Sequence, residues 1–155
     1  MSRAFVRETE GGEAFEDLPD RPISPHTNFV TPAGLEQIES EVARLQAEAA
    51  KLGPDDKADT ARVTRDLRYW TTRQGTAQLV ETVAGDTVHF GSTVTVLRED
   101  DTPQTFHIVG EDEADPHKGS IAYVAPLARA ITGKSVGDVV EVNGHDVEIT
   151  AIKVG

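Results

Sequence analysis

Apolar residues recur at steps of three and four along residues 32–52, the spacing of one face of an α-helix. Thr31 is a residue type that caps helices, and Pro32 suits a first helical turn, where its missing N–H would have no partner anyway. Gly53 and Pro54 end the pattern. The seam consists of Leu35, Ile38, Val42, Leu45, Ala49 and Leu52.

A second helix is predicted over about residues 55–80, where the same spacing continues. Because only the turn at Gly53-Pro54 separates the two helices, we expect them to be antiparallel, with each seam facing the other. The first helix would be about 30 Å long at 1.5 Å per residue, so the pair forms a narrow finger with its turn at the far end. The second seam consists of Val63, Leu67, Trp70, Gln74 and Ala77.

After Gly85 the apolar period changes from helical spacing to two, the period of β-strands. A short helix over residues 126–131 interrupts the strands and stops before Gly133, and Asn143-Gly144 is typical of a tight hairpin turn. The predicted strands cover residues 93–97, 105–109, 120–124, 139–142 and 147–154.

These elements predict an α+β fold with three parts. Residues 1–30 have no apolar period and form an acidic, proline-containing arm. Residues 31–84 form an antiparallel two-helix coiled coil. Residues 85–155 form a small sheet domain with one short helix.

Composition narrows the class of protein. The chain has 155 residues, of which 37% are apolar and 27% charged, and it has no cysteine, which excludes disulfide scaffolds and thiolate sites and fits a reducing compartment. It lacks the roughly 18 consecutive apolar residues of a membrane span and the apolar core of a signal peptide, so we expect a cytoplasmic protein. The net charge of −12 argues against free duplex DNA as a partner.

Enzyme chemistry is not indicated by the remaining motifs. The five histidines have no metal-ligand spacing, and neither a glycine-rich phosphate loop nor a serine elbow is present.

Three arginines, Arg62, Arg65 and Arg68, recur every third residue of the second helix. Two interpretations stay open: a solvated face paired with Glu41 or Glu48, or a patch that contacts RNA or an acidic protein surface.

Three motifs follow the predicted helical hairpin in a fixed order, at residues 90–94, 108–115 and 126–134, the last followed by Gly137-Asp138. This arrangement resembles the Gre family of bacterial transcript-cleavage and elongation factors. The resemblance implies an FKBP-like C-terminal domain that docks on RNA polymerase and a coiled coil that enters its secondary channel. The implied protein is monomeric, is not itself an enzyme, and meets transcript RNA or DNA only within the polymerase. The expected docking residues are Glu111, Asp112, Asp115, Ala125, Pro126 and Arg129.

Acidic residues at the hairpin turn have two interpretations. In cleavage-competent Gre factors, tip acids help hold a magnesium ion at the polymerase active site, and the resemblance assigns this role to Asp55, Asp56 and Asp59. The expected cofactor is then no stably bound group but magnesium shared with the polymerase. Alternatively, the three acids cap the second helix. Asp56 and Asp59 keep an i, i+3 spacing, but the Asp-Leu-x-Glu-Asn-type tip signature is absent and the finger is short.

Two other functions stay open. Val124-Ala125-Pro126 resembles the short-finger Rnk type, which is described as a regulator of nucleoside diphosphate kinase, and such a protein could also be a non-cleaving competitor of Gre factors. An FKBP-like domain also suggests a peptidyl-prolyl isomerase. The isomerase is less favoured because only Phe90, Phe106 and Tyr123 are available for an aromatic cage.

Overall fold

The computed structural model describes residues 18–154, and the first 17 residues of the predicted arm lie outside the described part. The chain divides into two compact units. Within the described residues, the hairpin unit combines residues 18–25 with Ile38–Thr76, and the sheet unit combines His26–Gln37 with residues 77–154. The residues of the predicted arm are therefore shared between the units. No helix within residues 18–154 has the length and apolarity needed to cross a membrane.

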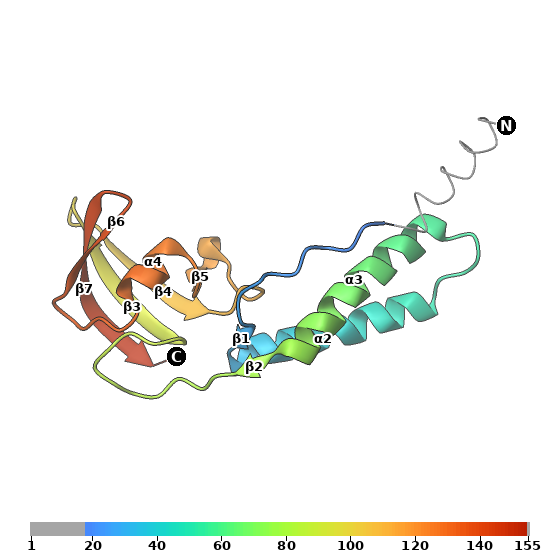
Figure 1. Cartoon of the computed structure of the whole chain (residues 1–155), viewed down its shortest axis with the longest axis horizontal. Coiled ribbons are helices and arrows are strands. Elements are labelled where there is room, and N and C mark those ends of the chain that lie inside the picture. The colour runs from blue at the N-terminus through green and yellow to red at the C-terminus, as the bar shows by residue number, and fades with distance from the viewer. Residues whose placement is uncertain (1–17, 155) are drawn as a thin grey trace. The chain divides into compact units, whose positions relative to one another are not determined.

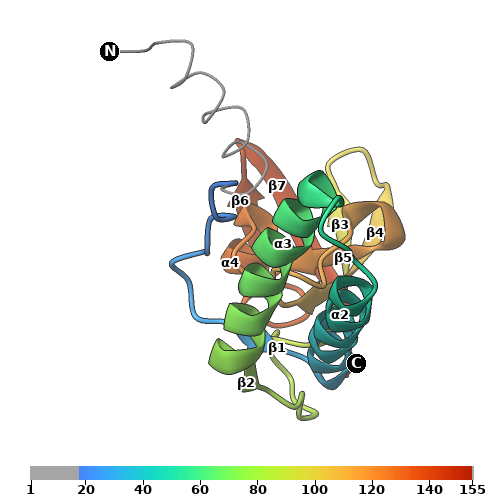
Figure 2. The ribbon, with the colours of Figure 1, turned by 90° about the vertical axis from the view of Figure 1, so that its right-hand side faces the viewer.

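The two predicted helices are present as α2 (Pro32–Ala50) and α3 (Lys57–Thr76), which lie side by side and antiparallel (Figures 1 and 2). Thr31 begins α2 as predicted, since its Oγ1 accepts a hydrogen bond from the Gly34 N–H at 3.0 Å. The predicted helical seam is confirmed in part, since Ala49 is exposed and three of its leucines are only half-buried. The fully or nearly fully buried members are Ile38, Val42, Leu45 and Val63.

The predicted second helix is wrong at its C-terminal end. α3 stops at Thr76 rather than near residue 80, because the next backbone groups pair with a strand: the Gln78 N–H donates to the Asn28 carbonyl at 2.8 Å. Gln74, predicted on the seam, is exposed, and its neighbour Arg73 is only 2% exposed instead. A buried guanidinium needs hydrogen-bond partners, and within residues 18–154 no buried side-chain nitrogen or oxygen lacks one.

The sheet unit begins with a two-residue parallel ladder between β1 (Phe29–Val30) and β2 (Gln78–Leu79). The Phe29 ring packs against Phe90 and Tyr123, with centroids 5.9 and 5.3 Å away. These aromatic contacts have centroid spacings and tilted orientations that favour ring pairs. Segments that are nearly fifty residues apart in sequence are therefore joined at the start of this unit.

The remaining strands form a five-stranded sheet in the order β5-β4-β3-β7-β6, which Figure 1 shows with α4 beside it. Only β4 and β5 pair in parallel. The predicted hairpin turn is confirmed, because Asn143 and Gly144 have φ angles of 54° and 80°, as a tight primed turn requires. The elements are β3 (Ser92–Arg98), β4 (Pro103–Val109), η1 (Pro116–Lys118), β5 (Ser120–Ala122), α4 (Pro126–Ile131), β6 (Val139–Val142) and β7 (His145–Val154).

The core of the sheet unit lies between the sheet and the apolar side of α4. Alternate residues of β3 and β7 point into it, as the period-two pattern predicts. Ile131 anchors the short helix there with no exposed surface. The buried cluster contains Val88, Val94, Val96, Phe106, Ile108, Ile121, Leu127, Ala128, Ile131, Val142, Val147 and Ile149.

The first turn of α4 has no side-chain cap, which leads to a stability prediction. Ala125 occupies the cap position with extended φ and ψ of −63° and 148° and offers no acceptor to the helix N–H groups. Ala125→Thr supplies that acceptor, whereas the isosteric Ala125→Val does not. We expect the threonine variant to exceed the valine variant by about 1 kcal/mol in free energy of unfolding, measured by urea denaturation. Equal stabilities would show that the α4 terminus is already satisfied.

Candidate functional site

The hairpin turn is closed by Asp56. The Asp56 carbonyl accepts the first helical hydrogen bond, from the Thr60 N–H at 2.8 Å, so Asp56 is the residue that immediately precedes α3. Its carboxylate turns back and accepts a hydrogen bond from the Gly53 N–H at 2.9 Å. Asp56 therefore precedes the helix, and its carboxylate stabilises the turn.

The other two predicted tip acids are differently engaged. Asp59 lies in the first turn of α3, where a carboxylate suits the positive end of the helix dipole, and it is 3.6 Å from the Arg62 guanidinium. Asp55 is exposed, and among residues 18–154 it has no hydrogen-bonding or ion-pairing partner. Asp55 is thus the tip carboxylate most available to a ligand from outside the chain.

Three of the four arginines of α3, Arg62, Arg65 and Arg68, face carboxylates. Arg62 pairs with Glu48 across the hairpin, as the solvated-face interpretation expects, while Glu41 pairs instead with Arg44 on its own helix at 2.7 Å. The hydrogen bond and the charge of Glu48 raise the pKa of Arg62 above its ordinary value. Each of these arginines has an acidic partner in the folded chain. Contact of these arginines with nucleic acid stays a prediction. The other two pairs are Arg65 with Asp66 at 3.2 Å and Arg68 with Asp20 at 2.6 Å.

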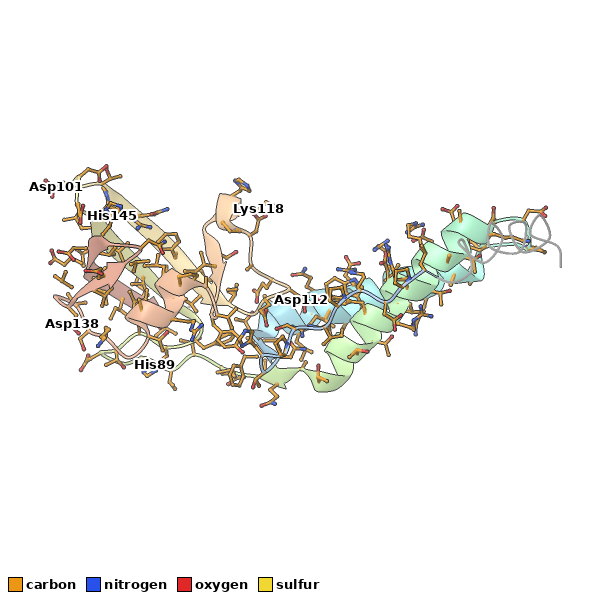
Figure 3. All side chains as sticks on the ribbon, turned by 45° about the horizontal axis from the view of Figure 1, so that its top comes forward. His89, Asp101, Asp112, Lys118, Asp138 and His145 are labelled. Carbon is orange, nitrogen blue, oxygen red and sulfur yellow. The ribbon has the colours of Figure 1, made fainter. Side chains whose placement is uncertain are left out.

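The acidic loop of the sheet unit is partly a structural element. Glu113 accepts the Thr31 hydroxyl proton at 2.6 Å, so the residue that caps α2 is itself held by this loop. The Asp112 carbonyl accepts a hydrogen bond from the Gln37 side chain at 3.3 Å, and Figure 3 places Asp112 beside the start of α2. Glu113 is not among the site residues that the sequence predicts. The one sequence feature connected with this contact is the glycine at position 34 of the helix. A Cβ there would lie 2.6 Å from the Glu113 carboxylate.

Asp115, an expected docking residue, also has an internal role. Its carboxylate accepts a hydrogen bond from the His117 N–H at 3.2 Å and caps the short helix η1. Its own N–H donates to the Ser120 hydroxyl at 2.9 Å. The half-buried Asp115 side chain is therefore oriented by the fold.

The other expected docking residues all belong to the same unit and are at least partly accessible. Glu111 and Asp112 are half-buried in the acidic loop, and Ala125 is half-buried ahead of α4. Pro126 and Arg129 are exposed on α4. Their role in docking stays a prediction.

Another polar cluster joins two hairpins at one end of the sheet, where Figure 3 labels Asp101 and His145. Glu99 accepts a hydrogen bond from the Asp146 N–H at 2.8 Å and lies 3.3 Å from His145 Nδ1. The Asp146 N–H, followed by His145, holds the pKa of Glu99 below its ordinary value.

Within the described ranges, no three histidine or acidic residues gather as a metal ion would need.

Comparisons with known proteins identify the family. The family model "Transcription elongation factor, GreA/GreB, C-term" matches residues 83–154. The chain is 55% identical over 62 residues to transcription elongation factor GreA of Maricaulis maris (strain MCS10), covering 39% of this chain and 40% of that relative. It is 36% identical over 132 residues to GreA of Zymomonas mobilis subsp. mobilis, covering 71% of this chain and 82% of that relative.

One structural neighbour is the GreA factor homolog 1 (Gfh1) protein of Thermus thermophilus, with 21% identity, a TM-score of 0.41, and coverage of 83% of this chain and 99% of that chain. The chain spans less than half the length of the Maricaulis relative but most of the length of the Zymomonas relative. These sequence matches confirm the resemblance carried by the three C-terminal motifs and favour it over the kinase-regulator and isomerase alternatives. The chain belongs to the GreA/GreB family of transcription elongation factors.

Proposed function

We propose that this protein binds bacterial RNA polymerase through its sheet unit and modulates elongation through the carboxylates of its hairpin turn. The observation that carries the proposal is the exposed Asp55 in a turn that Asp56 holds closed. The Asp56–Gly53 hydrogen bond restrains the backbone that carries Asp55, which lowers the backbone entropy lost on binding. The protein acts in the cytoplasm as a monomer and meets RNA only inside the polymerase complex.

The donor chemistry of the turn suits a magnesium ion held mainly by the polymerase. Magnesium prefers carboxylate oxygens, keeps several waters, and is commonly held by only one or two protein carboxylates. Asp55 supplies such a group directly, and Asp59 supplies a second when its long, exposed ion pair with Arg62 opens. When bound, the ion would favour hydrolysis of the transcript by the polymerase. Asp56 contributes by keeping the turn closed.

Transcript cleavage by backtracked polymerase tests this proposal directly. Addition of the protein to a backtracked complex with labelled RNA is expected to release short fragments. Asp55→Asn, which keeps the shape of the side chain but removes its charge, is expected to lower the cleavage rate at least tenfold. The matched control is Glu39→Gln, which removes one charge from an exposed position on α2. The control should cleave at the parent rate.

Three results would contradict the proposal in different ways. Cleavage that is unchanged in Asp55→Asn would remove the turn carboxylate from the mechanism. Binding without cleavage, together with inhibition of a second cleavage factor, would favour the competitor function. The absence of any binding to polymerase would overturn both.

A further inference from the structure

The chain segment from Leu18 to Pro25 runs beside α3 and makes specific contacts with it (Figure 1). It has no helix or strand, and Pro19 and Pro22 explain why: neither has an N–H to donate to a ladder. Proline also biases the residue before it towards extended backbone, so Arg21 is pre-set in an extended conformation. We call residues Asp20–Ile23 the strap.

Charge complementarity determines where the strap lies. The Asp20 carboxylate is 2.6 Å from Arg68 Nε, and the Arg21 guanidinium is 3.6 Å from the Asp66 carboxylate. Asp20 of the strap therefore contacts a basic residue of α3, and the neighbouring Arg21 contacts an acidic one. A segment with these charges in the opposite order would meet like charges at both positions.

An aromatic platform provides the second part of the recognition. The Arg21 guanidinium carbon lies 4.0 Å from the centroid of the Tyr69 ring and 5.9 Å from that of Trp70. The two rings pack edge to face at 5.2 Å, which holds the platform in place. Stacking on aromatic faces is a geometry that arginine favours over lysine.

Apolar contacts hold the strap only weakly. The groove beside it has a volume of about 420 Å³ and is lined by Ile23 together with Val63 and Leu67 of α3. Ile23 keeps 43% of its surface exposed, so it does not fill the groove. Adhesion therefore depends more on partly exposed ion pairs, which salt weakens, and on the contact of Arg21 with two aromatic rings.

We propose that the α3 face formed by Asp66, Arg68, Tyr69 and Trp70 is a docking surface for an extended segment with an acid next to an arginine. In the free protein the strap occupies this surface, and it leaves as ionic strength rises. Any partner that offers the same pair of side chains competes with the strap. This proposal does not depend on the proposed function in transcription.

Trp70 makes the proposal measurable, because it is the only tryptophan in the chain. In the full-length parent, acrylamide quenching of Trp70 fluorescence is expected to rise at least twofold between low salt and 1 M NaCl. Arg21→Ala is expected to show the high quenching already at low salt, and Arg21→Lys an intermediate value. Arg44→Gln is the matched control, since Arg44 pairs with Glu41 and Glu48 away from the strap. It should behave as the parent.

A peptide tests whether the face binds its ligand in trans. The synthetic octapeptide of residues 18–25, added to Arg21→Ala, is expected to lower Trp70 quenching with saturation. A scrambled octapeptide that separates the acid from the arginine should have no effect. Circular dichroism confirms that the variants keep their helices. Salt-independent quenching in the parent, equal quenching in parent and Arg21→Ala, or equal effects of the two peptides would each overturn the proposal.

Discussion

Leu45→Ala is expected to destabilise the hairpin unit by about 3 kcal/mol. Leu45 has no exposed surface, and only a few apolar side chains in this unit are comparably buried. Truncation removes most of its transfer free energy and leaves a cavity between two helices that have little other packing. Neither helix can bury its apolar stripe without the other. The variant should therefore lose helical order under conditions in which the parent is folded.

Urea denaturation followed by Trp70 fluorescence measures this effect, since Trp70 lies on α3. Leu45→Met is the matched control, because it conserves side-chain volume and should cost less than about 1.5 kcal/mol. Amide hydrogen exchange in β3 and β7 shows in the same sample whether the sheet unit stays folded. A loss below 1 kcal/mol in Leu45→Ala would mean that the buried seam is not what stabilises the hairpin.

Gly110→Ala is expected to destabilise the sheet unit by about 3 kcal/mol, since overpacking a close backbone contact has costs of this order. A Cβ at Gly110 would lie 2.3 Å from the Phe29 carbonyl oxygen, which is backbone and not a movable side-chain end. Phe29 cannot retreat without breaking the β1–β2 ladder and its contacts with two aromatic rings.

The measurement is thermal unfolding by circular dichroism, where this loss corresponds to a lower Tm by about 15 °C for a domain of this size. Gly75→Ala is the control, because nothing lies within 4 Å of a Cβ at that helical position. It should be stabilising by about 0.5 kcal/mol, since alanine favours helix over glycine. Similar stabilities of the two variants would contradict the close-contact interpretation of Gly110.

The local elements were predictable from sequence wherever one short-range rule determines them. The Thr31 cap, the Asn143-Gly144 turn and the period-two strands follow from side-chain and backbone preferences within a few residues. The end of α3 was not predictable in this way, because it depends on pairing with β1, nearly fifty residues earlier in the chain.

The candidate site was less predictable than the fold, for the same physical reason. The acids at 55, 56 and 59 look equivalent in sequence, but only the folded turn shows that Asp56 is engaged by Gly53 and that Asp55 has no partner within the described residues. The three arginines likewise appear as a basic patch until their carboxylate partners are seen. The contact of Asp20 with Arg68 joins segments that no local pattern relates.

The β1–β2 ladder makes the hairpin an insertion within the sheet unit. The chain leaves this unit after Gln37 and rejoins it at Ala77, while Phe29 stays in register with Gln78. Adding or deleting seven residues in each helix would keep the seam in phase and leave that register unchanged. Hairpin length is therefore a property that evolution or protein engineering can vary independently of the sheet unit.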